Sequence, residues 1–222
     1  MNKKIGWALI VALMVTGVAL EPAWGVEKGW YLGGGFSSQN LSGGFDGNFA
    51  YCSDSQCSKV PVLLPGKAKS GSGINLLGGY QINSNIGIEY LSSSTIHEST
   101  HVLKKEADPL SVVSGLFGIR VGAGIDLFNF FLRMGLASTT LSYDKASWVG
   151  GDSWEEVSFT GSGIGYGVGI AYQPTEWGVE FAYNQHNTRL DSLKAGNFSG
   201  RLEQPVSLKV ASLTVSVVYH FK

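Results

Sequence analysis

The sequence predicts an all-β fold in which eight antiparallel strands run up and down and close into a barrel. Three observations support this prediction: alternation of residue types, eight segments of strand length, and connections that alternate between short and long. The alternation is clearest over 163–172, where Gly or Ala occupies one face and Ile, Val or Tyr the other. A period of two is typical of a β-strand, whose successive side chains point to opposite faces, and a helix does not produce it.

The eight predicted strands are long enough to cross a membrane. They cover residues 28–39, 71–83, 85–95, 112–127, 129–143, 158–173, 177–190 and 207–221. Ten residues of a strand tilted by ~40° span about 25 Å, the height of the lipid-facing band of a membrane barrel. The connections at 83–85, 128 and 174–176 are tight turns, whereas 40–70, 96–111, 144–157 and 191–206 are long polar loops. This asymmetry predicts an up-and-down transmembrane β-barrel with short periplasmic turns and four long extracellular loops.

Composition and the first residues narrow the class of protein. A hydrophobic content of 44% excludes a disordered chain, and a net charge of −1 gives no reason to expect a nucleic-acid partner. Lys3 and Lys4 precede an apolar run over 5–20, and the small residues Ala23 and Gly25 follow this run. This pattern predicts a signal peptide over 1–25 and a barrel domain over 26–222. No later segment reaches the ~18 apolar residues of a membrane-spanning helix.

Four charged residues lie in the middle of predicted strands. They are Glu89, Arg120, Arg133 and Glu180, and all four are in phase with the glycine face of their strands. A basic side chain facing lipid near the membrane centre costs about 2 to 4 kcal/mol, whereas opposite charges inside a barrel can pair. We therefore predict an ion-pair network that fills the lumen, because an eight-stranded barrel is too narrow to stay open once its side chains are packed.

The ends of the mature chain carry a family resemblance. The segment 29–36 (GWYLGGGF), together with 217–221 (VVYHF), resembles the small outer-membrane barrels of the opacity-protein and outer-membrane-protein-A transmembrane-domain type. The resemblance covers the whole mature chain and implies a monomer in the lipid of the bacterial outer membrane, inserted by the barrel-assembly machinery. It also implies a non-enzymatic role, without a cofactor, in envelope integrity or in surface recognition and adhesion. The extracellular loops would carry that role by binding a surface ligand.

Two of the predicted loops contain candidate functional residues. The loop 144–157 combines Trp148 and Trp154 with four acids and one Lys, a net charge of −3 that includes Asp152, Glu155 and Glu156. This composition suits a partner-binding patch, although the two tryptophans would equally serve as anchors at the outer membrane interface. In the loop 40–70, Cys52 and Cys57 are predicted to form a disulfide because the chain is exported to an oxidising compartment.

One motif has the pattern of a zinc hydrolase. His97, Glu98 and His101 match His-Glu-x-x-His, in which a helix places both imidazoles on one face as metal ligands. The residues before His97 are poor helix formers, and Pro109 follows soon after. A solvated polar loop is therefore the favoured interpretation, and we predict no metal site.

Two further alternatives remain open at this point. His186 and Thr188 resemble in outline the histidine and hydroxyl of outer-membrane lipid A deacylases, but no nearby carboxylate is placed to orient the imidazole. A soluble periplasmic lipocalin-like ligand carrier would also have eight strands. Its outward face would be polar, whereas this sequence places Ile164 and Val168 there.

Overall fold

The computed structural model describes residues 28–43, 48–53, 56–61, 70–100, 107–143, 146–147, 153–154, 157–195 and 198–221. These residues form twelve strands. They are Gly29–Gly43 (β1), Asn48–Ser53 (β2), Gln56–Pro61 (β3), Gly71–Gln81 (β4), Ile86–Thr100 (β5), Ala107–Ile125 (β6), Phe128–Tyr143 (β7), Ala146–Ser147 (β8), Ser153–Trp154 (β9), Val157–Tyr172 (β10), Trp177–Ala195 (β11) and Phe198–His220 (β12). Within these ranges, no helix has the length and apolar character needed to cross a membrane.

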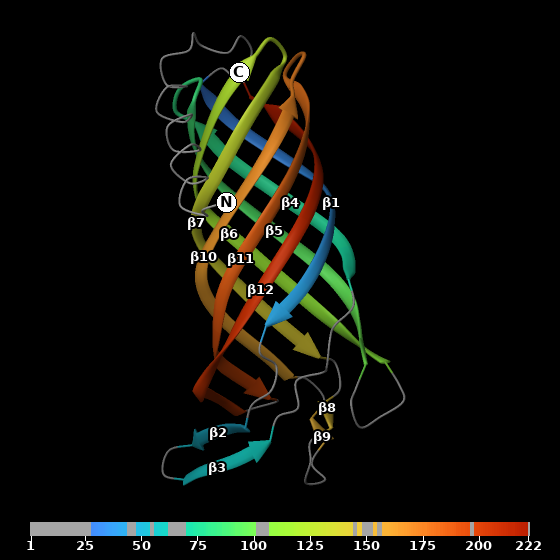
Figure 1. The fold of residues 1–222 in the computed structure, drawn as a ribbon, viewed down its shortest axis with the longest axis vertical. Helices are drawn as coiled ribbons and strands as arrows, with labels where there is room; N and C mark the ends of the chain where they lie inside the picture. Colours follow the sequence, from blue (N-terminus) through green and yellow to red (C-terminus); the bar gives the residue numbers. More distant parts are fainter. Residues whose placement is uncertain are drawn as a thin grey trace, which may run out of the picture.

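Eight of the strands form a closed barrel, as predicted. The order around the barrel is β1-β12-β11-β10-β7-β6-β5-β4, and every neighbouring pair is antiparallel. The remaining four strands form two hairpins, β2-β3 and β8-β9, which lie beyond one end of the barrel, opposite the end with the carboxyl terminus (Figure 1). The eight-stranded up-and-down fold is therefore confirmed.

The connections at the barrel end that holds the carboxyl terminus are short, as the sequence predicts. A two-residue turn joins β6 to β7, and Asp126 has a φ of 53° there. Asp tolerates this left-handed conformation better than most residues, and such values are typical of tight hairpins. In the β4-β5 turn, the side-chain oxygen Oδ1 of Asn83 accepts hydrogen bonds from the backbone N–H groups of Asn85 (2.9 Å) and Ile86 (2.8 Å).

At the other end the strands are longer than the sequence analysis proposed. The expected loop 191–206 is largely strand, because β11 continues to Ala195 and β12 begins at Phe198. Likewise, β5 continues to Thr100 and β6 begins at Ala107, so much of the expected loop 96–111 is strand. The polar residues of these two segments predict loops, but a strand whose outward side is in water can carry polar side chains on that side.

The outward face of the barrel carries an apolar belt that ends abruptly on several strands, including β10, β7 and β12. On β10 the outward residues from the turn are Tyr172, Ile170, Val168, Tyr166 and Ile164, followed by Ser162, Thr160 and Ser158. On β7 the same change comes between Leu136 and Ser138, and on β12 it comes between Ala211 and Lys209. On β5, the outward residues Ser92 and Ser94 come before Ile96, and on β6 the outward apolar residues continue to Val113.

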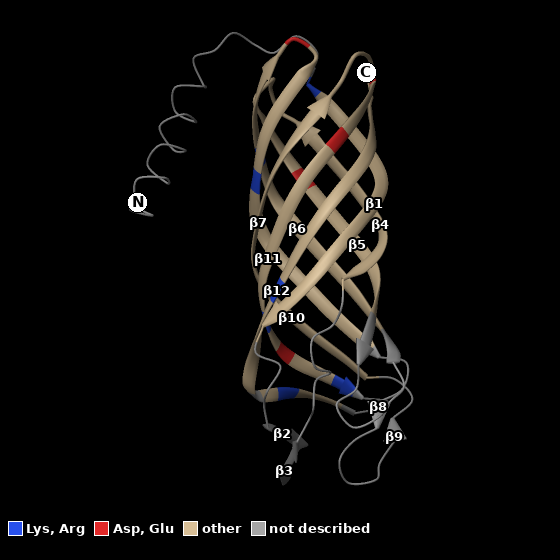
Figure 2. Cartoon of the chain, turned by 45° about the vertical axis from the view of Figure 1, so that its right-hand side comes forward, with Lys and Arg blue, Asp and Glu red and all other residues tan. Residues whose placement is uncertain are grey.

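We call the part of the barrel from the short turns to this boundary the membrane section, and the strand residues beyond it the outer section. Aromatic pairs mark the turn end of the membrane section: Trp30 packs on Tyr80, Phe128 on Tyr172, and Trp177 on Tyr219, with ring centroids 4.7 to 5.1 Å apart. Such rings are typical of a membrane interface. Figure 2 shows few charged residues along the barrel wall and several at the end near β2-β3 and β8-β9.

Candidate functional site

The structure brings the four predicted lumen charges into one ion-pair network. Arg120 Nη1 lies 3.2 Å from Glu89 Oε2 and 2.8 Å from Glu180 Oε2. Arg133 Nε lies 3.1 Å from Glu89 Oε1, and Arg133 also pairs with Glu180. Each base therefore contacts both acids. The strands β5, β6, β7 and β11 supply one member each, so the network ties four of the eight strands together across the lumen.

The network is buried and its charges balance. Side-chain exposure is 11% for Arg120 and at most 3% for the other three. A buried charge is tolerated only when it is paired and hydrogen-bonded, and here two cations face two carboxylates with a net charge of zero. The charges of the network therefore compensate one another inside the barrel, and its side chains occupy the lumen at that level.

Two aromatic residues complete this layer, and the sequence analysis missed both. Tyr31 Oη donates a hydrogen bond to Glu89 Oε2 at 3.0 Å. The Phe131 ring lies under both guanidinium groups, 3.9 Å from Arg120 Cζ and 4.8 Å from Arg133 Cζ, distances suited to cation–π attraction. The sequence does contain a signal for both residues. Tyr31 on β1 and Phe131 on β7 each alternate with the outward apolar residues of their strand, which places them on the lumen face.

Glycines make room for these rings. A Cβ atom added to Gly79 would overlap the Tyr31 ring, and one added to Gly169 would overlap the Phe131 ring. The glycine face that first indicated strands is therefore the space that large lumen side chains from other strands fill. This arrangement explains how a narrow barrel holds two arginines and two aromatic rings at nearly the same level.

A second, apolar layer fills the lumen at the outer section. Its buried members are Leu110, Val112, Leu141, Val157, Phe159, Leu190, Leu193, Leu202, Val206, Leu208 and Val210. The β11-β12 hairpin contributes the largest share, because a register shift between Leu190 and Ser192 bends it and brings Leu193 and Leu202 into the layer. This layer is not among the features predicted from the sequence.

Between the two layers the lumen holds polar side chains together with a smaller apolar cluster, whose members are Tyr31, Leu77, Leu91, Leu116, Ala137 and Val218. Gln39 Nε2 donates to Ser114 Oγ (3.0 Å), and Thr95 Oγ1 donates to Gln39 Oε1 (2.8 Å). Asn75 Nδ2 on β4 donates to Ser216 Oγ (2.9 Å) on β12, with only β1 between the two strands. Hydrogen bonds therefore link side chains from strands that are not neighbours, which adds cross-lumen contacts to the wall's own ladder.

The zinc motif does not have the helical conformation that its chemistry requires. His97 is buried in β5, 2.9 Å from Thr95 Oγ1, and the backbone from Glu98 to Thr100 continues the same strand. His101 lies outside the described residues. The favoured interpretation of 97–100 as a solvated polar loop is wrong, because these residues continue β5 and His97 is buried. The helix that the zinc motif needs does not form there either, since the Ser and Thr residues before His97 favour an extended strand.

The deacylase-like residues both face the lumen. His186 is 2% exposed and Thr188 is 3% exposed. Neither ring nitrogen of His186 has a hydrogen-bond partner, and Thr188 Oγ1 donates to the Leu208 carbonyl at 3.5 Å. The hydroxyl and the imidazole are therefore not hydrogen-bonded to each other, and a nucleophile and its base must be.

The predicted loop residues are only partly within the described part of the chain. The backbone register of β2-β3 places Cys52 opposite Cys57, a spacing compatible with the predicted disulfide, although their side chains are not described. Trp154 belongs to the short strand β9. Trp148, Asp152, Glu155 and Glu156 lie outside the described residues, and the side chain of Trp154 does too.

The fold and the lumen geometry together define an outer-membrane barrel, and the family comparison agrees. The sequence model of the family described as outer membrane protein beta-barrel domain matches residues 10–221. The chain therefore belongs to this family, and its place is the bacterial outer membrane. A sequence comparison with curated proteins found no match.

Solved structures of small outer-membrane barrels have the same fold. OprG from Pseudomonas aeruginosa is 15% identical with a TM-score of 0.54, over 90% of this chain and 99% of that one. Ail of Yersinia pestis, solved in complex with the heparin analogue sucrose octasulfate, is 15% identical with a TM-score of 0.51, over 88% and 100%. Neisserial surface protein A is 14% identical with a TM-score of 0.51, over 86% and 97%. At these identities the likeness concerns the fold.

Proposed function

We propose that the protein is a non-enzymatic outer-membrane barrel that serves envelope integrity or surface recognition and adhesion through its extracellular end. The observation that carries this proposal is the filled lumen. The ion-pair network closes one level of the barrel and the apolar layer closes another. A barrel filled in this way anchors and presents its loop end rather than conducting solutes.

The geometry of the candidate catalytic residues supports the absence of an enzymatic role. His97 belongs to a strand, and His186 and Thr188 lie inside the lumen rather than against lipid. The lipocalin-like alternative fails on the outward face, where Trp30, Phe36, Leu136 and Leu213 are each at least 63% exposed. A water-soluble barrel would place such residues inside.

The solved relatives support a role at the surface. Ail was crystallised with a sulfated sugar bound, so a barrel of this fold can present a surface that binds an extracellular ligand. For this chain we propose one surface ligand, bound by the loops, together with membrane lipid and the assembly machinery as its other partners. We propose that it works as a monomer and needs no cofactor.

Loop replacement in whole cells tests this proposal. Residues 44–69 and 144–156 are each replaced by a short Gly-Ser linker, and the cells are tested for binding to host cells, matrix proteins and sulfated sugars, and for survival in detergent and bile salts. Heat-dependent mobility on an SDS gel shows that each variant still forms a barrel. We expect at least one variant to lose binding or envelope resistance.

Two results would overturn the proposal. The first is unchanged binding and unchanged envelope resistance in every loop variant. The second is solute passage, measured as swelling of vesicles that contain the purified protein, which would assign the function to the lumen. Hydrolysis of lipid A or peptides that disappears in Thr188→Val or His97→Gln would assign the protein to an enzyme class.

A further inference from the structure

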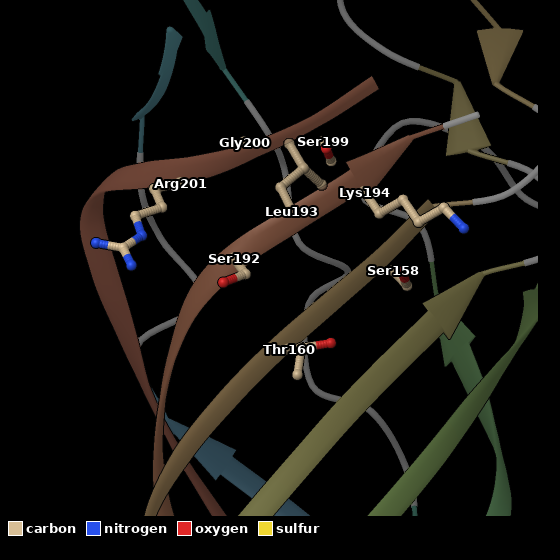
Figure 3. Close-up of a pocket in the computed structure, with 8 residues that line it drawn as sticks. All are labelled: Ser158, Thr160, Ser192, Leu193, Lys194, Ser199, Gly200 and Arg201. Carbon is tan, nitrogen blue, oxygen red and sulfur yellow. The ribbon is translucent and has the colours of Figure 1, made fainter. Parts of the chain in front are cut away.

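The outer section carries a polar depression on its outward wall that neither the filled lumen nor the loops explain. Its polar lining consists of Ser158, Thr160, Ser192, Lys194, Ser199 and Arg201, which we call the rim site. Figure 3 shows the hydroxyl groups of Ser192 and Thr160 between the two basic side chains, Lys194 on one side and Arg201 on the other.

The strand register explains why these residues gather. On β10 and β11, Thr160 pairs with Ser192 and Ser158 pairs with Lys194, so the four lie in two adjacent rows. On β11 and β12, Ser192 pairs with Arg201 and Lys194 pairs with Ser199. The bend of the hairpin after Leu190 therefore places three strands of hydroxyl and basic side chains around one depression.

Most of the charged side chains described on this wall are basic. The described, exposed side chains of β11 and β12 beyond the apolar belt include Arg189, Lys194, Arg201 and Lys209 but only one acid, Asp191. Asp191 Oδ1 accepts a hydrogen bond from Ser192 Oγ at 3.0 Å and does not line the depression. Guanidinium, ammonium and hydroxyl donors together form the donor set that binds phosphate groups.

The distance of the rim site from the apolar belt indicates which kind of lipid headgroup could place a phosphate there. Ser158 and Thr160 lie on the same face as Ile164, the last apolar residue of the belt, and Thr160 is four residues beyond it. At ~3.3 Å per residue and ~40° of tilt, this places the site about 10 Å beyond the belt. Simple headgroups extend only about 5 to 8 Å beyond the hydrocarbon, so a larger phosphorylated headgroup fits this height.

We propose that the rim site binds the phosphate of a phosphorylated sugar headgroup of an outer-leaflet glycolipid. Arg189 and Lys209, lower on the same wall, add positive charge between the belt and the site. The site faces along the membrane rather than away from the cell, so its ligand is a lipid beside the barrel. This inference rests on the outer-membrane location and is independent of the surface-recognition role.

Native mass spectrometry tests the proposal with lipid A as the probe. The purified full-length protein in neutral detergent is titrated with diphosphoryl lipid A, with monophosphoryl lipid A and with phosphatidylcholine. We expect retention in that order, strongest for the diphosphoryl form. The variant Lys194→Gln/Arg201→Gln should bind diphosphoryl lipid A about 30-fold more weakly, because each basic residue near a headgroup contributes roughly a fivefold change.

Two further variants make the test specific. Lys28→Glu changes the net charge by the same −2 as the double variant, but it lies at the opposite rim, so its lipid A binding should equal that of the wild type. Asp191→Asn removes the nearby acid and should tighten binding severalfold. An SDS gel with heated and unheated samples shows that each variant is folded.

The proposal is overturned if the double variant retains diphosphoryl lipid A as well as the wild type does. It is also overturned if lipid A binding falls equally in Lys28→Glu, since the effect would then be one of net charge. Displacement of lipid A by equimolar inorganic phosphate, or by an equimolar soluble sulfated sugar, would likewise overturn it, because the site would then bind a free anion rather than a lipid.

Discussion

The membrane section and the outer section of this barrel place opposite kinds of side chain inside and outside. In the membrane section, Val168 and Leu213 face lipid while Arg133 and Glu180 pair in the lumen. In the outer section, hydroxyl and basic side chains face outward, while Leu208 and the other members of the apolar layer face inward. A single strand passes through both sections without interruption, so the backbone is the same and only the surroundings differ.

This comparison shows that the surroundings decide which face of a strand is apolar. Where the wall meets hydrocarbon, outward apolar residues are favoured, and charged and polar groups lie in the lumen, where several pair with one another. Where the wall meets water and headgroups, the lumen becomes an ordinary hydrophobic core. The polarity change between Ser162 and Ile164 therefore marks the edge of the membrane on β10.

Breaking the lumen network should have the largest effect on stability. Glu180→Ala leaves Arg120 and Arg133 with one carboxylate between them, and an unpaired buried charge costs about 3 to 5 kcal/mol. The free energy of unfolding from lipid vesicles in urea, followed by tryptophan fluorescence, measures this loss. Asp191→Ala on the exposed wall is the control and should change stability by no more than about 0.5 kcal/mol.

A paired variant sharpens this prediction. Arg133→Met combined with Glu180→Gln removes one charge of each sign, so the remaining Arg120 and Glu89 still balance. Its loss should be smaller than the sum of the two single losses. Additive losses would mean that the four side chains do not act as a network.

An arginine placed on the outward face compares the two sections directly. Met134 and Ser142 lie on the same face of β7, the first in the apolar belt and the second in the outer section. Met134→Arg should cost about 2 to 4 kcal/mol because the charge enters hydrocarbon, whereas Ser142→Arg should cost about 0 to 1 kcal/mol. The same urea unfolding experiment measures both, and equal losses would contradict the assigned boundary.

A smaller effect is expected from the apolar layer. Leu208→Ala removes a buried side chain of the outer section and should cost about 2 kcal/mol, the low end for this substitution, because the layer lies near the loop end and can partly collapse. Amide hydrogen exchange should quicken in the β11-β12 hairpin while the membrane section stays protected. Ser207→Ala, the outward neighbour, should leave both measurements unchanged, and general loss of protection in Leu208→Ala would mean that the sections are not separable.

Much of the membrane section could be predicted from the sequence, because lipid imposes a strong rule. Alternation identified the strands and their lipid-facing residues. Because Glu89 lies two residues from Gly87, on the same face of the strand, the sequence alone predicts that this charge faces the lumen. The positions of Tyr31 and Phe131 were not predicted, because an aromatic residue on the lumen face needs an open space opposite, and only the register reveals Gly79 and Gly169 there.

The outer section was harder to predict because its alternating apolar residues face the lumen, whereas those of the membrane section face lipid. Leu208 and Val210 are in phase with Ser212 and Thr214, so they belong to the lumen face, and this signal was present in the sequence. Leu208 and Val210 fall within the predicted strand 207–221, but the hydroxyl and charged residues before them indicated a loop over 191–206. The same misinterpretation hid the rim site, since Lys194 and Arg201 fall within the residues that were expected to form the loop 191–206.

The division into a membrane section and an outer section is tested most directly by whether lipid or water contacts each backbone amide. The measurement is nuclear Overhauser contact from backbone amide protons to lipid methylene protons and to water, for the protein in lipid nanodiscs. We predict lipid contacts for amides from Ile164 to Tyr172 and from Leu213 to Tyr219, with water contacts from Ser158 to Ser162 and at Ser207 and Lys209. Lipid contacts that continue to Ser158 and Ser207, or water contacts at Val168 and Val215, would contradict the account.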